Sequence, residues 1–432
     1  MQHKKHASGW LGQLTGSRVF KALGPGLITG AADDDPSGIA TYSQAGAQFG
    51  FAITWTLLFT YPLMAAIQEI SARIGRTTGC GVAANLRQHY PKWILQLIVF
   101  SVVIANAINI GADLGAMADA VTLLVGGPAL IYVILFGIVC AGLEVFIPYA
   151  RYVSVLRWLT FALFAYFGTV LVVKVPWSEA IKGFFIPTLS PDPEFWTVVV
   201  AIFGTTISPY LFIWQASQEV EEIDNVAERK PLIQSARQGK SALRRIRIDT
   251  FIGMAFSNLV ALAIMFTTAA TLNAAGTTDI QTSSQAAEAL KPIAGPFAFT
   301  IFSLGVIGTG LLAVPVLAGS AAYAICEARK WPIGLARQPL EAKAFYTTIV
   351  IATLSGVAIT FSPLDPIKAL FWSAVINGIV AVPVMAMMMF IGANQKIMKD
   401  FAIAGPLKYI GWVATAVMAA ASLGMIVTSA IT

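Results

Sequence analysis

The sequence predicts an all-α polytopic membrane protein with about eleven transmembrane helices. Apolar residues make up 57% of the chain and the mean hydropathy is +0.73. Charged residues make up 12%, whereas soluble domains carry about 25%. Apolar runs of about 20 residues follow one another, each long enough to cross a hydrocarbon core about 30 Å thick. One membrane domain is therefore expected in place of a series of soluble domains.

Polar connections between the apolar runs give approximate bounds for each span. The predicted spans cover about 22–47, 50–72, 93–121, 128–147, 152–174, 194–217, 247–272, 294–326, 343–361, 365–392 and 406–430. The stretch 277–292 is polar with an Ala/Leu pattern and predicts a short amphipathic helix on the outer surface. Residues 1–21 are polar and basic and predict a cytoplasmic tail that is not a signal peptide. Residues 22–432 are then one transmembrane domain.

Basic residues alternate between the two sets of connections. One set is rich in Lys and Arg, and the other holds only Lys174, Lys182, Lys291 and Lys368. The positive-inside rule therefore predicts a cytoplasmic N-terminus and, for eleven spans, a C-terminus outside the inner membrane. The basic loop 229–247 fits topology determination and contact with anionic lipid better than a dedicated lipid or nucleotide site. The net charge of +6 then reflects these loops and predicts no nucleic-acid partner.

The first span is broken by an acidic stretch. Asp33, Asp34 and Asp35 precede Pro36 and interrupt a segment that is otherwise uncharged and mostly apolar. A charge at the bilayer centre costs about 3 kcal/mol or more, and proline leaves backbone groups that lipid cannot satisfy. The stretch therefore needs a cation, water or a protein partner, and we interpret it as half of a metal-ion site.

The sixth span has a second break around Ser208 and Pro209. Spans 1 and 6 are equivalent if the chain consists of two five-span repeats, about 22–174 and 194–392, followed by an extra helix at about 406–430. After an odd number of spans the second repeat begins on the opposite side, so the repeats are inverted. Paired interruptions of this kind indicate a transporter's midplane site. Two independent proline kinks are the alternative.

Oxygen atoms dominate the groups that these breaks bring together. Pro36 frees carbonyls near Ala32, and Pro209 frees the carbonyl of Thr205. Asp35 is the best-placed charged ligand. The hydroxyl of Ser208 adds another oxygen, and none of these groups contains sulfur or imidazole. Such ligands suit Mg²⁺, Ca²⁺ or Mn²⁺ better than Zn²⁺ or Cu⁺.

Neighbouring carboxylates cannot all face one ion in a helix, because successive residues lie about 100° apart. We therefore expect Asp33 or Asp34 to line an aqueous vestibule or to pair with Arg or Lys elsewhere, and a solvated rim is the alternative.

Further polar residues at membrane depth indicate an ion path. Asn106, Asn109 and Asp113 share one helix face at i, i+3 and i+7. They line an ion path or, alternatively, make hydrogen bonds between helices. Glu69 and Arg73 form an i, i+4 pair with a structural or gating role.

Several motifs in order resemble the Nramp family of divalent-metal transporters. They are Gly24-Pro25-Gly26 with Asp35-Pro36, Gln68-Glu69-Ile70-Ser71-Ala72-Arg73-Ile74-Gly75 with Thr78-Gly79, Ala112-Asp113-Leu114, and Arg247-Ile248-Asp249-Thr250. The resemblance covers essentially the whole membrane domain. It implies the LeuT-type fold with broken helices 1 and 6 and a metal site between their unwound parts. It also implies that the tenth span lines the path, which makes Asn377 a further candidate ligand.

The sequence departs from the family pattern at the ligand positions. Where family members carry Asn, Met and His, this chain has Gly38, Ser208 and Tyr210, and the span-3 Glu becomes Ala116. The resemblance thus implies a larger site without sulfur and with fewer titratable groups. Mg²⁺ dehydrates reluctantly and suits such a site. The pattern looks like the Nramp-related magnesium transporter branch, whose members are described as carrying Mg²⁺ and Mn²⁺ without evident proton coupling.

The expected function is uptake of Mg²⁺, with Mn²⁺ accepted, by alternating access without strong proton coupling and without a cofactor. A proton-coupled Mn²⁺/Fe²⁺ transporter is the first alternative, with Asp34, Asp113 and Glu69 as candidate proton carriers. A symporter of small organic solutes with the same fold is the second, although three aspartates would repel a solute carboxylate. An enzyme is not expected, because the sequence offers no nucleophile–base arrangement.

Overall fold

The computed structural model describes residues 29–30, 32–147, 159–226, 228–361 and 365–431. The predicted tail 1–21, the Gly24-Pro25-Gly26 motif and the first part of the fifth span lie outside the described residues. Within these ranges the chain is helical and contains no β-strand.

Helices follow one another from the first break to the end of the chain. The first group consists of α4 (Pro36–Phe49), η1 (Gly50–Ile53), α5 (Trp55–Thr78), α6 (Val82–His89), α7 (Lys92–Val125), α8 (Ala129–Phe146), η2 (Leu159–Leu163), α10 (Phe164–Val172) and α11 (Trp177–Phe185). The second consists of α12 (Pro193–Thr206), α13 (Pro209–Asn225), η3 (Ala236–Gln238), α14 (Gly239–Thr271), η4 (Asn273–Ala275), α15 (Ser283–Glu288), α16 (Lys291–Ala294), η5 (Gly295–Phe297), α17 (Ala298–Arg329), α18 (Lys343–Ile359), α19 (Pro366–Ala393), α20 (Gln395–Met398), η6 (Lys399–Phe401) and α21 (Gly405–Ile431).

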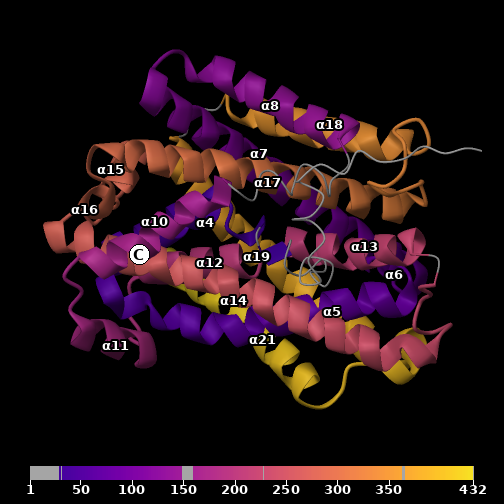
Figure 1. The fold of residues 1–432 in the computed structure, drawn as a ribbon. Helices are drawn as coiled ribbons and strands as arrows, with labels where there is room; N and C mark the ends of the chain where they lie inside the picture. Colours follow the sequence, from indigo (N-terminus) through magenta and orange to yellow (C-terminus); the bar gives the residue numbers. More distant parts are fainter. Residues whose placement is uncertain (1–28, 31, 148–158, 227, 362–364, 432) are drawn as a thin grey trace, which may run out of the picture.

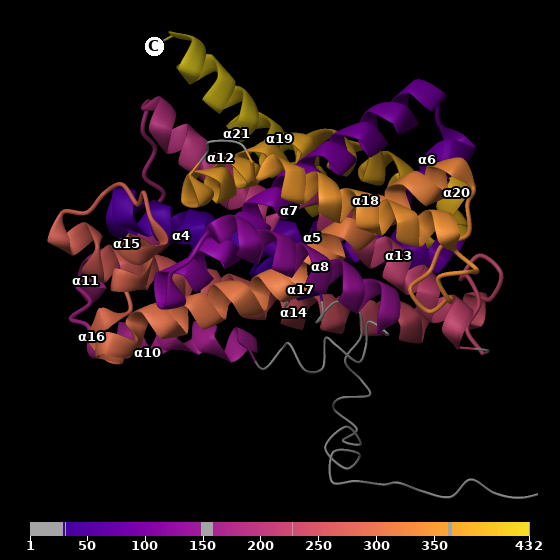
Figure 2. The ribbon, with the colours of Figure 1, turned by 90° about the horizontal axis from the view of Figure 1, so that it is seen from above.

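The long helices form a bundle whose ends carry the short ones. Seven helices within the described ranges are long and apolar enough to span a membrane, and α12 with α13 counts as one of them. The pair α4–η1 and α5 meets at a bend of 109°, and two shorter apolar helices cover Phe161–Val172 and Lys343–Ile359. Each predicted span overlaps one of these helices, although the first and fifth spans lie partly outside the described residues. Figures 1 and 2 both place α11, α15 and α16 at one end of the bundle and α6 at the other.

Some helix bounds differ from the sequence-based expectation. α5 continues to Thr78 instead of ending near residue 72, and α14 begins at Gly239 instead of residue 247. Arg and Lys are good helix formers, so a helix continues through its basic end after the apolar run stops. The helices α6 and α11 were not expected, because neither contains an apolar run of spanning length. The polar stretch 277–292 does form short helices, α15 and α16.

Both predicted breaks are present. Helical residues stop at Asp33, the chain bends at Asp34, and α4 begins at Pro36. Similarly, α12 ends at Thr206 and α13 begins at Pro209. Proline is favoured at the first position of a helix because the amide it lacks has no partner there anyway. Since α4 packs against α12, α14 and α19, the break before α4 lies among these helices.

One glycine fixes how closely α12 approaches α19. A Cβ atom on Gly204 would lie 2.9 Å from Cα of Gly378 and 2.5 Å from its backbone nitrogen, closer than real Cβ atoms come. Small residues let membrane helices approach to backbone contact. This contact holds the middle of α19 beside the sixth-span break.

Candidate metal-ion site

Asp35 lies at the centre of the first break and is 2% exposed. Its Oδ1 accepts a hydrogen bond from the Gly38 amide at 2.7 Å and one from the Ser37 hydroxyl at 2.6 Å. The carboxylate therefore caps α4, which is an ordinary role for an aspartate at this position. Its burial distinguishes it from Asp192, the exposed carboxylate that caps α12 before Pro193.

The second oxygen of Asp35 is held by a chain of two side chains. Asn109 of α7 donates from Nδ2 to Oδ2 of Asp35 at 3.0 Å. Ser373 of α19 donates to Oδ1 of Asn109 at 2.6 Å. Three helices thus fix the direction of one carboxylate. An ionised carboxylate has about four lone-pair sites, so three donors leave room for one further partner.

Asp33 and Asp34 are buried, at 0% and 3% exposed. Ser257 of α14 lies 2.5 Å from Oδ2 of Asp33 and 3.1 Å from Oδ1 of Asp34, and its hydroxyl proton serves one of them at a time. The interpretation of these residues as a solvated rim is therefore wrong in this conformation, because α14 covers them. Buried carboxylates this close together, with so few donors, require a proton or a cation.

The two breaks share hydrogen bonds. Tyr210, at the start of α13, donates its hydroxyl to the Ala32 carbonyl at 3.2 Å. The Ser208 hydroxyl lies 2.9 Å from the carbonyl oxygen of Thr205 and 2.8 Å from that of Gly204, and its one proton is donated to either of them. The carbonyls freed by the prolines thus accept hydrogen bonds from side-chain hydroxyls in this conformation. Each carbonyl oxygen has a second lone pair, and Ser208 keeps its own acceptor sites.

Gly38 faces α12 across the space between the breaks. A Cβ atom at this position would lie 3.1 Å from Oγ1 of Thr205 and 3.3 Å from Cε2 of Tyr42. A longer side chain at residue 38 would occupy space beside the Thr205 hydroxyl. Residue 38 is therefore closely packed against α12 in this conformation, and glycine fits there without displacing a neighbour.

The three polar residues on one face of α7 have different surroundings. Asn106 donates to the carbonyl of Leu317 at 2.9 Å. It therefore makes a hydrogen bond between two helices, which was the alternative to lining an ion path. Asn109 instead contacts Asp35. Asp113 is fully buried, and neither carboxylate oxygen has a donor within hydrogen-bonding distance, although the backbone amide of Ser37 faces it.

Two other candidates occupy different surroundings. Asn377 of α19 is 1% exposed, and both polar atoms of its amide lack a hydrogen-bond partner among the described residues. Glu69 belongs to an ion-pair cluster, because its Oε1 lies 2.5 Å from Nη2 of Arg73 and 3.4 Å from Nε of Arg247. The expected Glu69–Arg73 pair therefore forms.

No group of three His, Cys, Asp or Glu side chains that could hold a metal ion occurs in the described part of the chain. The arrangement instead offers one well-oriented carboxylate, Asp35, with neutral hydroxyl, carbonyl and amide oxygens nearby. Such a set suits a hard divalent cation that stays partly hydrated and is released again.

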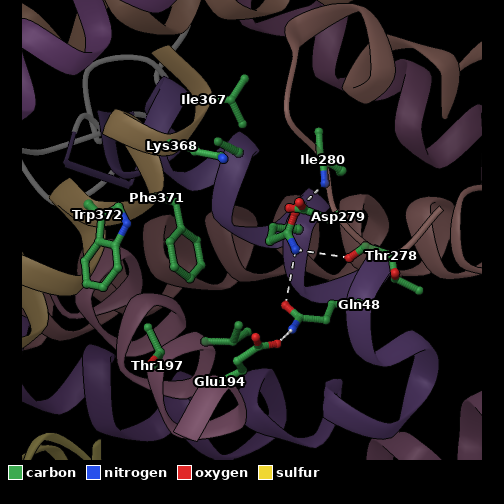
Figure 3. Close-up of a pocket in the computed structure, with 13 residues that line it drawn as sticks. Gln48, Glu194, Thr197, Thr278, Asp279, Ile280, Ile367, Lys368, Phe371 and Trp372 are labelled. Atoms are coloured by element: carbon green, nitrogen blue, oxygen red, sulfur yellow. Dashed lines mark hydrogen bonds between the residues drawn. The ribbon is translucent and has the colours of Figure 1, made fainter. Parts of the chain in front are cut away.

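A pocket of about 500 Å³ opens beside the C-terminal half of α4 (Figure 3). It is lined by residues of α4, α12, α19 and the loop after η4. Gln48 donates to Oε2 of Glu194 at 2.7 Å. Gln44 donates to the Thr278 carbonyl at 3.2 Å and accepts from the Ile280 amide at 2.8 Å. These contacts tie α4 to α12 and to the loop.

Sequence reasoning missed several of these residues. Ser257 and Ser373 carry no local signal, because a lone serine in an apolar helix is common. Gln44 and Gln48 recur at i, i+4, a spacing that would have predicted a polar face on α4, although that face was not identified from the sequence.

Known proteins resemble this chain over nearly its whole length. The family model described as "Nramp: Natural resistance-associated macrophage protein-like" matches residues 26–428. The chain is 26% identical over 422 residues to the "Divalent metal cation transporter MntH" of Klebsiella pneumoniae subsp. pneumoniae, and the match covers 94% of each protein.

Solved structures share the fold. The Eremococcus coleocola manganese transporter, in complex with an aromatic bis-isothiourea substituted compound, has a TM-score of 0.72 at 16% identity, covering 99% of this chain and 88% of that one. MhsT in complex with L-phenylalanine has a TM-score of 0.63 at 15% identity, covering 96% and 98%. At these identities the likeness concerns the fold alone.

Proposed function

The chain belongs to the Nramp family, and we propose from this premise that it carries Mg²⁺, and also Mn²⁺, across the membrane by alternating access. It is a multi-pass divalent metal-ion transporter of the Nramp/MntH type and not an enzyme, and the metal ion is its substrate and not a cofactor. The preference for Mg²⁺ is our own inference, because the names of the relatives speak of divalent metals and manganese.

The observation that carries the Mg²⁺ proposal is the lining of the two breaks by oxygen atoms. Ser208 and Gly38 stand where the family pattern has a methionine and an asparagine, so the soft sulfur and one direct ligand are absent. Without sulfur, the site has no chemical preference for soft transition metals. Mg²⁺ usually retains part of its water shell, and without an asparagine at residue 38 the site has one direct ligand fewer to replace that water.

In this proposal Asp35 is the principal charged ligand. The carbonyl oxygens of Ala32 and Thr205 and the hydroxyl of Ser208 assist it, some of them through water. The unpartnered amide of Asn377 supplies a further oxygen. The path to the site and its gates would involve Asp34, Glu69, Asn109, Asp113 and Tyr210, whereas Asn106 joins α7 to α17.

The membrane potential would drive uptake. A divalent cation moving inward gains about 4.6 kcal/mol per 100 mV. We propose the inner membrane as the location, with a cytoplasmic N-terminus and an outer C-terminus, because basic residues are concentrated on one set of connections.

A proton-coupled Mn²⁺ or Fe²⁺ transporter is the second candidate function. Asp113 favours it, because this buried carboxyl has no close donor and lies near enough to Asp35 for their charges to interact. A group of this kind accepts a proton when a cation leaves the neighbouring carboxylate.

Uptake into proteoliposomes that contain a pH-sensitive dye separates the two candidates. We expect saturable Mg²⁺ and Mn²⁺ uptake under an inside-negative potential without acidification of the lumen. Asp35→Asn in the same liposomes is the inactive control. Acidification that follows Mn²⁺ uptake would contradict the uncoupled mechanism, and Mn²⁺ uptake without Mg²⁺ uptake would contradict the ion preference.

A further inference from the structure

A groove of about 710 Å³ lies apart from the metal-ion site, where three helix ends meet. It runs between the beginning of α7 and the end of α17, beside the end of α6. Its lining residues are Arg87, Gln88, Lys92, Leu95, Gln96, Val99, Phe100, Val103, Ile325, Ala328, Arg329 and Lys330. Cationic and apolar side chains are both present, and none of the lining residues is acidic.

The cations gather at one end of the groove. Arg87 lies in the last turn of α6, Lys92 begins α7, Arg329 ends α17, and Lys330 caps it. None of the four forms an ion pair in the described part of the chain. Four cations without an ion-pair partner at the meeting point of three helices attract an anion.

The neighbouring carboxylate, Glu327, interacts electrostatically with Arg87 but forms no ion pair with any of the four cations in the described part of the chain. Glu327 is 3% exposed and its oxygens point inward, where Oε2 accepts from the Ala84 amide at 3.0 Å and Oε1 from the Ser217 hydroxyl at 3.0 Å. Arg87 instead donates to the backbone carbonyl of Glu327. The cationic end of the groove therefore remains open to a ligand from outside.

The rest of the groove is apolar and follows the helix axis. Leu95, Val99 and Val103 recur every four residues along α7 and form one stripe. Ile325 and Ala328 of α17 face the stripe across the groove. A small soluble anion would make no favourable contact with this apolar surface, whereas an acyl chain would pack against it.

Two tryptophans indicate the depth of the groove in the bilayer. Trp93 follows Lys92 and is 65% exposed, and Trp331 follows Lys330 and is 45% exposed. Exposed tryptophans gather at the level of the lipid headgroups. The cations beside them therefore lie where phosphates lie, and the apolar stripe extends toward the hydrocarbon core.

We propose that this groove is a binding site for one anionic phospholipid. Its phosphate contacts Arg87, Lys92, Arg329 and Lys330, and one acyl chain lies along the α7 stripe. The bound lipid joins the end of α17 to the corner between α6 and α7. In the proposed topology this is the cytoplasmic face, where anionic lipids and basic pockets between helices match.

Native mass spectrometry of the purified full-length protein, titrated with phosphatidylglycerol or phosphatidylcholine, tests the site. We expect phosphatidylglycerol to bind at least about tenfold more tightly, and Arg329→Gln with Lys330→Gln to remove this difference. The matched control is Lys240→Gln with Arg244→Gln, which removes two exposed cations from α14 on the same face, and it should leave the affinity unchanged.

Three results would overturn the proposal. Equal losses in the control would show diffuse attraction with no defined site. Equal affinity for phosphatidylcholine and phosphatidylglycerol would show that the four cations do not select lipids by the net charge of the headgroup. Competition by glycerol 3-phosphate at equal phosphate concentration would show a site for a soluble anion. If the double variant does not fold, Lys92→Gln removes one cation at the first residue of α7 and carries the same expectation.

Discussion

Asn109 donates its side-chain amide to Oδ2 of Asp35 across 3.0 Å and thereby joins the middle of α7 to the break before α4. The other oxygen of Asp35 is engaged by the cap of α4. The carboxylate is thus aimed before any ion arrives. Preorganisation of this kind lowers the cost of binding, because the ligand group does not need to be ordered when the ion enters.

Removing the amide should therefore weaken ion binding without abolishing it. In Asn109→Ala, Asp35 loses its lateral support, and loss of such outer partners typically costs about 10–100-fold in metal affinity. Isothermal titration with Mg²⁺ and Mn²⁺ measures the change. Asn106→Ala is the matched control, because Asn106 is equally buried on the same helix but donates to the Leu317 carbonyl. Equal losses in both variants would show that α7 packing, and not Asp35, sets the affinity.

Asp35→Asn should abolish divalent-ion binding while leaving the fold intact. Asparagine caps a helix about as well as aspartate, so α4 keeps its N-terminal hydrogen bond. The charge, which supplies most of the attraction for the cation, disappears. Titration with Mg²⁺, Mn²⁺ and Cd²⁺ tests this, and an apparent melting temperature near that of the unmutated protein verifies the fold.

Asp192→Asn makes the same chemical change at an exposed cap that also precedes a proline. It should bind all three ions as the unmutated protein does. Normal binding by Asp35→Asn would place the ion elsewhere in the molecule.

Ser208→Cys should shift selectivity toward soft ions. The substitution is nearly isosteric and places sulfur where only oxygens face the site, and sulfur favours Cd²⁺ over Mg²⁺. We expect the ratio of Cd²⁺ to Mg²⁺ affinity to rise at least about tenfold, which corresponds to about 1.4 kcal/mol. Ser208→Ala removes the oxygen without adding sulfur and should not raise the ratio. An unchanged ratio in Ser208→Cys would mean that residue 208 does not reach the ion.

The fold was predictable from sequence because lipid restricts what can cross it. Apolar runs gave the spans, and the two breaks occur where they were predicted, before Pro36 and Pro209. The short helices α6 and α11 were not predicted, since neither contains an apolar run long enough to span the membrane. The bounds of α14 differed because its basic first turns continue a helix that hydropathy alone ends too early.

Less of the candidate site could be predicted, because its partners are distant in sequence. Asp35 was identified from its position before Pro36, and Asn109 from its helix face. Neither signal indicated that the two side chains bond to each other. Asp33 and Asp34 are buried beside Ser257, which lies more than two hundred residues away in the sequence. No local sequence pattern predicts this burial.

Glu144 of α8 provides a test of how this protein tolerates buried charge. It is 3% exposed, and neither of its oxygens has a hydrogen-bond partner among the described residues. The carboxylate faces α17, since a Cβ atom on Gly319 would lie 3.6 Å from its Oε1. No ion pair in the described part of the chain offsets the cost of burying it.

Glu144→Gln should therefore stabilise the protein. A buried group without partners costs about 1–3 kcal/mol, and more when it is charged, so a neutral amide of the same shape lowers the cost. The apparent melting temperature should rise by several degrees, at about 2–4 °C per kcal/mol. Glu288→Gln is the control, because this side chain is 45% exposed and its pair with Lys291 is a surface contact worth about 0–1 kcal/mol. A lower melting temperature in Glu144→Gln would reveal a stabilising partner for the carboxylate, which a proton or a bound cation would supply.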